Sequence, residues 1–71
     1  MRKINVKLIE KAIDKRGRQG LQKMALEVEV SITAMRNLLN GNTKNPSLTT
    51  VTNLLRATGE SFDRLFPLSK E

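Results

Sequence analysis

Apolar residues recur along this chain at intervals of three and four positions, the spacing of one face of an α-helix. Five separate stretches show the pattern, and none alternates as a half-buried strand would. The first occupies residues 4–14, with Asn5 as its expected N-cap and Gly17 beyond its end. Its apolar face consists of Ile4, Leu8, Ile9, Ala12 and Ile13. Two glycines within residues 17–20 then predict a loop.

Two further stretches follow with only a short turn between them. One occupies residues 21–28, and the other begins at Ser31, a typical N-cap, and ends at Asn40–Gly41. The inner faces consist of Leu21, Met24, Ala25 and Val28 in the first helix and of Met35, Leu38 and Leu39 in the second. The small Ala25 side chain lets a crossing helix approach closely. Because the turn at Glu29–Val30 is so tight, the two helices must cross at a steep angle and leave one face of the second exposed.

That exposed face is expected to carry Ile32, Thr33, Arg36 and Asn37, with Asn40 at its end. Arginine binds guanine with two hydrogen bonds, asparagine binds adenine in the same way, and the methyl groups of threonine and isoleucine contact that of thymine. Ordinary solvated helices also carry such residues. Taken alone, this face is better explained as an ordinary solvent-exposed helix surface than as a base-contacting one. The neighbouring elements of the chain have to decide between the two interpretations.

Two more helices are predicted after a polar loop. Pro46 prevents helical continuation through residues 42–46, and Ser47 is expected to cap a fourth helix that ends at Gly59. Its apolar positions are Leu48, Val51, Leu54 and Leu55. Ser61 is expected to cap a last short helix carrying Phe62, Leu65 and Phe66, which Pro67 terminates. The pattern as a whole predicts one all-α domain over residues 1–71, with a short tail at 67–71.

Composition restricts the chemistry available to this domain. The chain has no cysteine and no histidine, which excludes disulfides, imidazole catalysis and the common zinc sites. With no carboxylates clustered on one face either, we expect no enzyme activity, no metal and no cofactor. No apolar run approaches the roughly 18 residues of a membrane span, and the N-terminus lacks the apolar stretch of a signal peptide. A cytoplasmic protein is therefore expected, with the lysine-rich first helix lying on a membrane surface as a minor alternative.

The charge of the chain is +6 and unevenly distributed. Residues 1–23 hold eight of the 13 lysines and arginines but only Glu10 and Asp14 as acidic residues. Such a surface attracts polyanions, and nucleic acid is the leading partner for a small domain of this kind. A merely solubilising face explains the same charge equally well.

The spacing of the last three elements resembles the phage repressor and Cro helix-turn-helix family. The stretch that carries the resemblance is SITAMRNLLNGNTKNPSLTTVTNLLRATGESFDRLF, residues 31–66. Its matching positions are Ser31, Met35, Leu38, Asn40, Gly41, Pro46, Ser47, Leu48, Gly59 and Ser61 to Phe66. The resemblance extends over residues 4–66 and implies a compact five-helix, lambda-repressor-like domain with its helix-turn-helix at about residues 21–40. It also implies a bacterial or phage-encoded transcriptional regulator.

The family resemblance further implies how this chain would bind double-stranded DNA. The third helix would enter the major groove, with Ile32, Thr33, Arg36 and Asn37 facing the bases. Phosphate contacts would come from Gln22, Lys23, Asn40, Thr43, Lys44 and Ser47. A homodimer on a palindromic operator is expected, without a small-molecule ligand. The end of the fourth helix, Glu60 and the tail formed by Phe66, Pro67 and Leu68 are the surface expected to pair.

Three positions depart from the family pattern. Glu29 stands where relatives carry glycine, so either the turn holds a strained residue or it takes another course. Relatives often begin the second helix with a phosphate-binding glutamine, whereas this chain has Leu21 followed by Gln22. Leu39 replaces a glutamate that relatives pair with an arginine of the first helix, and an apolar contact with Ile13 is the expected substitute. The alternative function is an antitoxin-like or other protein-interaction module built on the same fold.

Overall fold

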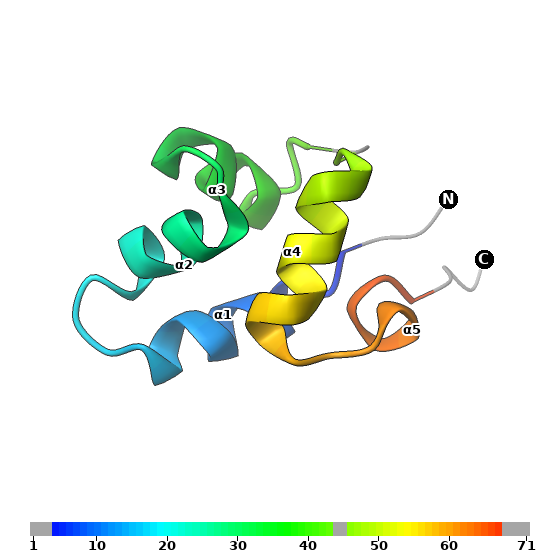
Figure 1. Cartoon of the computed structure of the whole chain (residues 1–71), viewed down its shortest axis with the longest axis horizontal. Helices are drawn as coiled ribbons and strands as arrows, with labels where there is room; N and C mark the ends of the chain where they lie inside the picture. The colour runs from blue at the N-terminus through cyan, green and yellow to red at the C-terminus, as the bar shows by residue number, and fades with distance from the viewer. Residues whose placement is uncertain (1–3, 44–45, 68–71) are drawn as a thin grey trace.

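Five helices follow one another in the computed structural model of the chain, which describes residues 4–43 and 46–67. They are α1 (Val6–Lys15), α2 (Gly20–Val28), α3 (Ile32–Leu39), α4 (Leu48–Thr58) and α5 (Phe62–Leu65). No strand occurs within those two ranges, so the predicted all-α class is confirmed. Figure 1 shows α4 crossing in front of α1, with α2 and α3 on one side and α5 on the other. None of these helices is long and apolar enough to cross a membrane.

Serine side chains begin three of the helices, as the sequence predicts. The hydroxyl oxygens of Ser31, Ser47 and Ser61 accept the backbone N–H groups of Ala34 at 3.0 Å, Thr50 at 3.2 Å and Arg64 at 3.3 Å. Asn5 occupies the N-cap position of α1, but its side chain makes no capping hydrogen bond. Its backbone N–H donates instead to the carbonyl of Leu65 at 2.7 Å, which ties the beginning of α1 to α5.

Two glycines are required by the backbone around α2 and α3. Gly41 ends α3 at φ 77°, a left-handed conformation that glycine adopts without steric cost, and this confirms the predicted cap. Gly20 begins α2 one residue earlier than predicted. A Cβ atom at Gly20 would lie 2.3 Å from the carbonyl oxygen of Ile13. Glycine therefore permits the close approach of α1 and α2.

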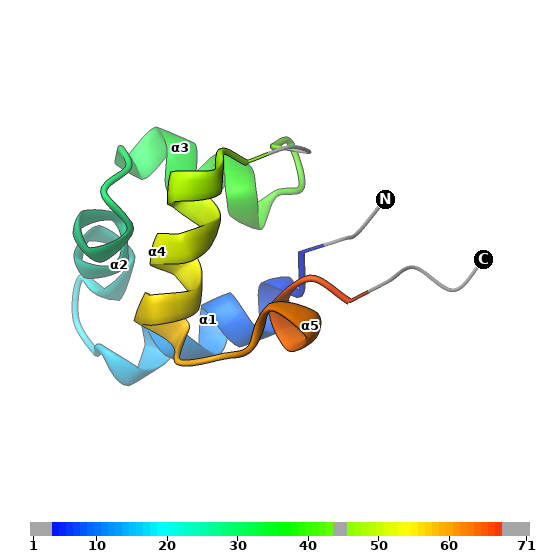
Figure 2. The same cartoon turned by 45° about the vertical axis from the view of Figure 1, so that its right-hand side comes forward.

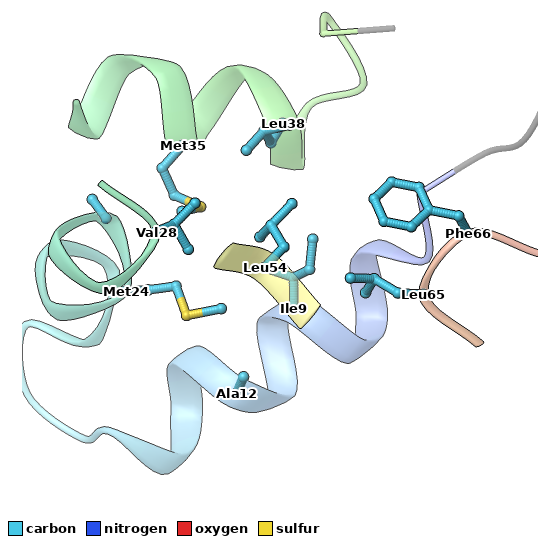
Figure 3. Close-up of a cluster of buried hydrophobic side chains, with 10 residues drawn as sticks. Ile9, Ala12, Met24, Val28, Met35, Leu38, Leu54, Leu65 and Phe66 are labelled. Carbon is cyan, nitrogen blue, oxygen red and sulfur yellow. The ribbon is translucent and has the colours of Figure 1, made fainter. Parts of the chain in front are cut away.

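The core takes side chains from all five helices (Figure 3). Ile9, Met24, Met35, Leu54 and Leu65 are completely buried, and Ala25 is 2% exposed. Aliphatic packing thus holds the fold, as expected for a chain without disulfides. Leu39 and Ile13 are both half-buried against this core, and their predicted mutual contact stays a prediction.

Two apolar residues lie differently from the sequence-based expectation. Leu48 begins α4 and is 80% exposed, although its spacing predicts a place on the inner stripe. Phe66 is 5% exposed and belongs to the core, so its ring is not exposed for pairing, and the predicted pairing surface stays a prediction. Phe62 is the more exposed of the two rings, at 44%, and stacks on Phe66 with 5.2 Å between ring centroids. Glu60 is half-buried and pairs with Arg64 at 3.3 Å, whereas Leu68 lies outside the described residues.

Candidate nucleic-acid interface

The helices α2 and α3 are joined by a turn of three residues, 29–31. Glu29 adopts the left-handed conformation, at φ 65° and ψ 43°. Its N–H donates to the carbonyl of Leu26 at 3.2 Å, and the N–H of Val30 donates to that of Ala25 at 3.0 Å. These two hydrogen bonds make a complete Schellman motif, the usual way of stopping a helix with a left-handed residue. The sequence allowed either a strained Glu29 or a turn with a different backbone course. The structure has the strained Glu29.

A buried side chain from α4 completes the end of α2. The Nδ2 atom of Asn53 donates to the carbonyl oxygen of Val28 at 3.0 Å. Asn53 is only 7% exposed and lies beside Leu54, which is on the apolar stripe of α4. Sequence reasoning missed this contact. The only signal for it was a polar residue next to the inner stripe of a helix.

The exposed face of α3 is narrower than predicted. Thr33 and Arg36 are exposed, and the side chain of Arg36 makes no hydrogen bond or ion pair with another described residue. Asn37 is half-buried. Ile32 is half-buried as well and packs against the core, which corrects its expected outward position. Two of the four side chains predicted to contact bases are therefore fully available to a partner.

The side chains predicted to bind phosphate lie on both sides of α3. Gln22 and Lys23 are exposed on α2, and Asn40 is exposed just after α3. The ammonium of Lys23 donates to the carbonyl of Arg16 at 3.3 Å, which holds it over the loop between α1 and α2. Thr43 is half-buried, and Lys44 lies outside the described residues.

Ser47 caps α4 as predicted, and its predicted phosphate contact stays a prediction. Its hydroxyl accepts the backbone N–H of Thr50 and donates its own proton to the Thr50 hydroxyl at 3.0 Å. The Ser47 proton is therefore already used inside the protein. Around this point, the beginning of α4 presents backbone N–H groups that have no carbonyl partner within the helix.

A shallow groove separates α3 from the beginning of α4. It has a volume of about 170 Å³ and is lined by Val30, Ala34, Leu38, Thr43, Pro46, Ser47 and Thr50. Figures 1 and 2 both place α3 along the upper edge of the molecule, next to the first turns of α4. α3 is thus supported from below, through Met35 and Leu38 in the core, and is open along the flank that faces α4.

An arginine just after α1 joins three helices behind this surface. The guanidinium of Arg16 makes two hydrogen bonds with the Glu27 carboxylate, one of them from Nη2 to Oε1 at 2.5 Å, and the other from Nε to Oε2. It also donates to the carbonyls of Ala12 at 2.6 Å and Ala57 at 2.9 Å. Hydrogen bonding between the two side chains lowers the pKa of Glu27 and raises that of Arg16. The end of α1 is thus joined to α2 by the ion pair between Arg16 and Glu27, two positions that the family pattern does not indicate.

The described residues contain no group of three or more acidic side chains close enough to hold a metal ion. What this surface offers is an exposed helix with a free guanidinium, flanked by an exposed lysine and by polar side chains. Comparison of the chain with family models, curated proteins and solved structures gave no match, so the interpretation of the surface rests on its own residues.

Proposed function

We propose that this chain is a sequence-specific DNA-binding transcriptional regulator of the repressor or Cro type, with a lambda-repressor-like arrangement of its five helices. The observation that carries the proposal is α3, which follows α2 after only three residues and exposes Thr33 and Arg36. A helix presented in this way fits the major groove of B-DNA. The net charge of +6 supports the same partner, because a basic domain is attracted to the phosphate backbone.

Arg36 and Thr33 carry most of the proposed base contacts. The Arg36 guanidinium binds guanine with two hydrogen bonds, and the Thr33 methyl group contacts a thymine methyl. Asn37 contributes through the exposed part of its amide. Ile32 mainly supports the beginning of α3 from the core side, since it is half-buried.

Phosphate contacts on the two sides of the DNA major groove fix the position of α3. Gln22 and Lys23 bind one strand, and Asn40, Thr43 and Lys44 bind the other. At the beginning of α4, the free backbone N–H groups of Leu48 and Thr49 replace the Ser47 hydroxyl as donors, because that hydroxyl is bound to Thr50. Contacts of this kind position the protein without selecting a sequence.

The proposed functional unit is a homodimer. A single domain of this size buries too little DNA surface for tight, specific binding, whereas a two-fold dimer places two copies of α3 about one helical turn apart on a palindrome. Phe62, exposed at 44%, replaces Phe66 as the aromatic residue available to such a contact.

Fluorescence anisotropy tests the proposal directly. Wild-type protein is used to select its preferred duplex from a random-sequence pool, and its affinity is compared with that for a scrambled duplex of equal composition. We expect Arg36→Ala to reduce discrimination between the two by about 1–3 kcal/mol. Lys23→Ala weakens binding to both duplexes equally and lowers the salt dependence by about one unit of slope.

Arg56→Ala is the matched control, because it removes the same charge from an exposed position of α4. It should leave discrimination unchanged. Equal losses of discrimination in Arg36→Ala and Arg56→Ala would overturn the assignment of α3 to the groove. A wild-type protein that prefers no duplex would overturn the function itself.

A further inference from the structure

Asn53 is the only buried polar side chain within the described residues. The rest of the core is aliphatic except for the Phe66 ring and the two thioethers of Met24 and Met35. A buried amide in such surroundings is unfavourable unless its polar atoms are hydrogen-bonded. The 3.0 Å bond from Asn53 Nδ2 to the Val28 carbonyl meets that requirement for the amide nitrogen, and it spans 25 positions of the chain.

The acceptor of this bond lies at the point where α2 becomes the turn. Val28 is the last residue of α2, and its carbonyl is among the four at the end of a helix that lack a helical partner. The Schellman hydrogen bonds use the carbonyls of Ala25 and Leu26 and leave that of Val28 free. Asn53 satisfies it from α4 and so joins the α2 end of the turn to the centre of the fold.

This bond matters for α3 because α3 has little other support from α4. The groove lined by Ala34 and Leu38 on one side and Thr50 on the other separates the two helices near the beginning of α4. Only residues 29–31 connect Val28 to α3, and they hold one strained residue, Glu29. α3 is held mainly by packing on α1 and α2 through Met35 and Leu38. The bond at the end of α2 adds a direct link from this packed unit to α4, and it lies next to the turn that begins α3.

We infer that Asn53 is a positioning residue for DNA recognition: its amide fixes the α2–α3 turn on α4 and thereby sets the orientation of α3 in the major groove of DNA. The inference rests on the proposed function and adds a residue that does not touch DNA. Loss of the bond lets α3 adopt a range of orientations. Base contacts require close geometry, whereas phosphate attraction does not, so discrimination falls further than affinity for scrambled DNA.

Asn53→Leu removes the amide with little change in side-chain size. We expect discrimination between the selected and scrambled duplexes to fall about tenfold, with affinity for the scrambled duplex within about twofold of wild type. Leu65→Val is the control, because it weakens the core in α5, away from the turn. Both variants are measured at a temperature where circular dichroism shows them folded.

Asn53→Asp provides a second, reversible measurement. A buried carboxyl group has a raised pKa, and in its protonated form it donates a hydrogen bond to the Val28 carbonyl, which the carboxylate cannot do. Discrimination should therefore approach the wild-type value at pH 5.5 and fall at pH 7.5. Wild-type protein, with no histidine, is the control over the same range. It keeps the charges of Glu27 and Glu29, which flank Val28 in the chain, and of Arg56, three residues after Asn53.

Unchanged discrimination in a folded Asn53→Leu protein would overturn the inference. So would an equal loss in Leu65→Val, because general instability would then explain both results. If wild-type protein prefers no duplex, the proposed function fails on its own, and the positioning role is judged without DNA. Amide chemical shifts of residues 29–39 must then change in Asn53→Leu and not in Leu65→Val.

Discussion

Replacing Glu29 with glycine is expected to stabilise this protein. Glu29 holds a left-handed conformation, which costs a residue with a Cβ atom about 1–2 kcal/mol. Glycine avoids this cost but loses about 0.5–1 kcal/mol through the greater freedom of its unfolded chain. The midpoints of these two ranges differ by about 0.75 kcal/mol, so we expect a gain of about 0.5–1 kcal/mol for Glu29→Gly. The Schellman hydrogen bonds involve only backbone atoms and are retained.

Nothing else of comparable size is lost with the Glu29 side chain. It is exposed and makes no ion pair or hydrogen bond with another described residue. For a domain of this length, 1 kcal/mol corresponds to about 4–8 °C in melting temperature. Glu29→Gly should therefore melt roughly 2–8 °C above the wild-type protein.

Thermal and urea unfolding, each followed by circular dichroism, measure this difference. Glu29→Gln is the control, because it removes the charge and keeps the Cβ atom, and its stability should stay within about 0.5 kcal/mol of wild type. Glu29→Asn should fall between the two, since asparagine tolerates the left-handed region better than glutamate. A Glu29→Gly protein no more stable than wild type, or a Glu29→Gln protein as stable as the glycine variant, would refute the argument from strain.

Three further predictions concern stability and use the same unfolding measurements. Gly20→Ala should lose about 1–3 kcal/mol, because the new Cβ atom would lie 2.3 Å from the Ile13 carbonyl oxygen, and a loss below about 0.5 kcal/mol would show that the two helices separate easily. Leu54→Ala should lose about 2–5 kcal/mol and Leu48→Ala less than about 0.5, since the first side chain is fully buried and the second 80% exposed; comparable losses would contradict these burials. The pKa of Glu27 is lower in the folded protein than in the unfolded chain, so its carboxylate stabilises the fold above the unfolded pKa, and this contribution disappears as the pH falls through the folded pKa. Glu27→Gln should therefore lose less stability between pH 7 and pH 3 than wild type does, and parallel curves would show that the Arg16 pair contributes nothing.

Local chemistry made the ends of the helices predictable. Ser31, Ser47 and Ser61 cap helices wherever they precede an apolar stripe, and Gly41 and Gly59 end helices through their left-handed conformation. Each of these signals acts over a few residues. The sequence therefore contained both the signal and its effect, and the predicted boundaries lie within two residues of those observed.

The burial and the distant partners of some side chains could not be predicted from such local signals. Ile32 and Leu48 are the first residues of their helices, where the spacing of apolar residues says little about depth because the helix can extend past the core or begin inside it. Phe66 follows α5 and turns back into the core, which no helical spacing describes. Glu27 and Ala57, which bind Arg16, and Val28, which binds Asn53, lie 11 or more positions from their partners, so these contacts become visible only in the three-dimensional fold.

Several departures from simple folding rules adjoin the α2–α3 turn. Glu29 is strained, Asn53 is a buried amide, and the flank of α3 facing α4 is open, and all three features adjoin the α2–α3 turn. Outside the turn, Gln19 before α2 also adopts the left-handed conformation, at φ 57°. The serine caps, glycine ends and aliphatic packing of the other described residues agree with one another. Sequences are expected to violate such rules mainly where function requires it, because strain and buried polar groups reduce stability without helping the fold. The features at the turn therefore support the proposed role of α3 on grounds other than Arg36 and the net charge. It also makes Asn53 and Glu29 opposite kinds of test: replacing Asn53 should cost recognition, whereas replacing Glu29 with glycine should add stability while the position of α3 is kept.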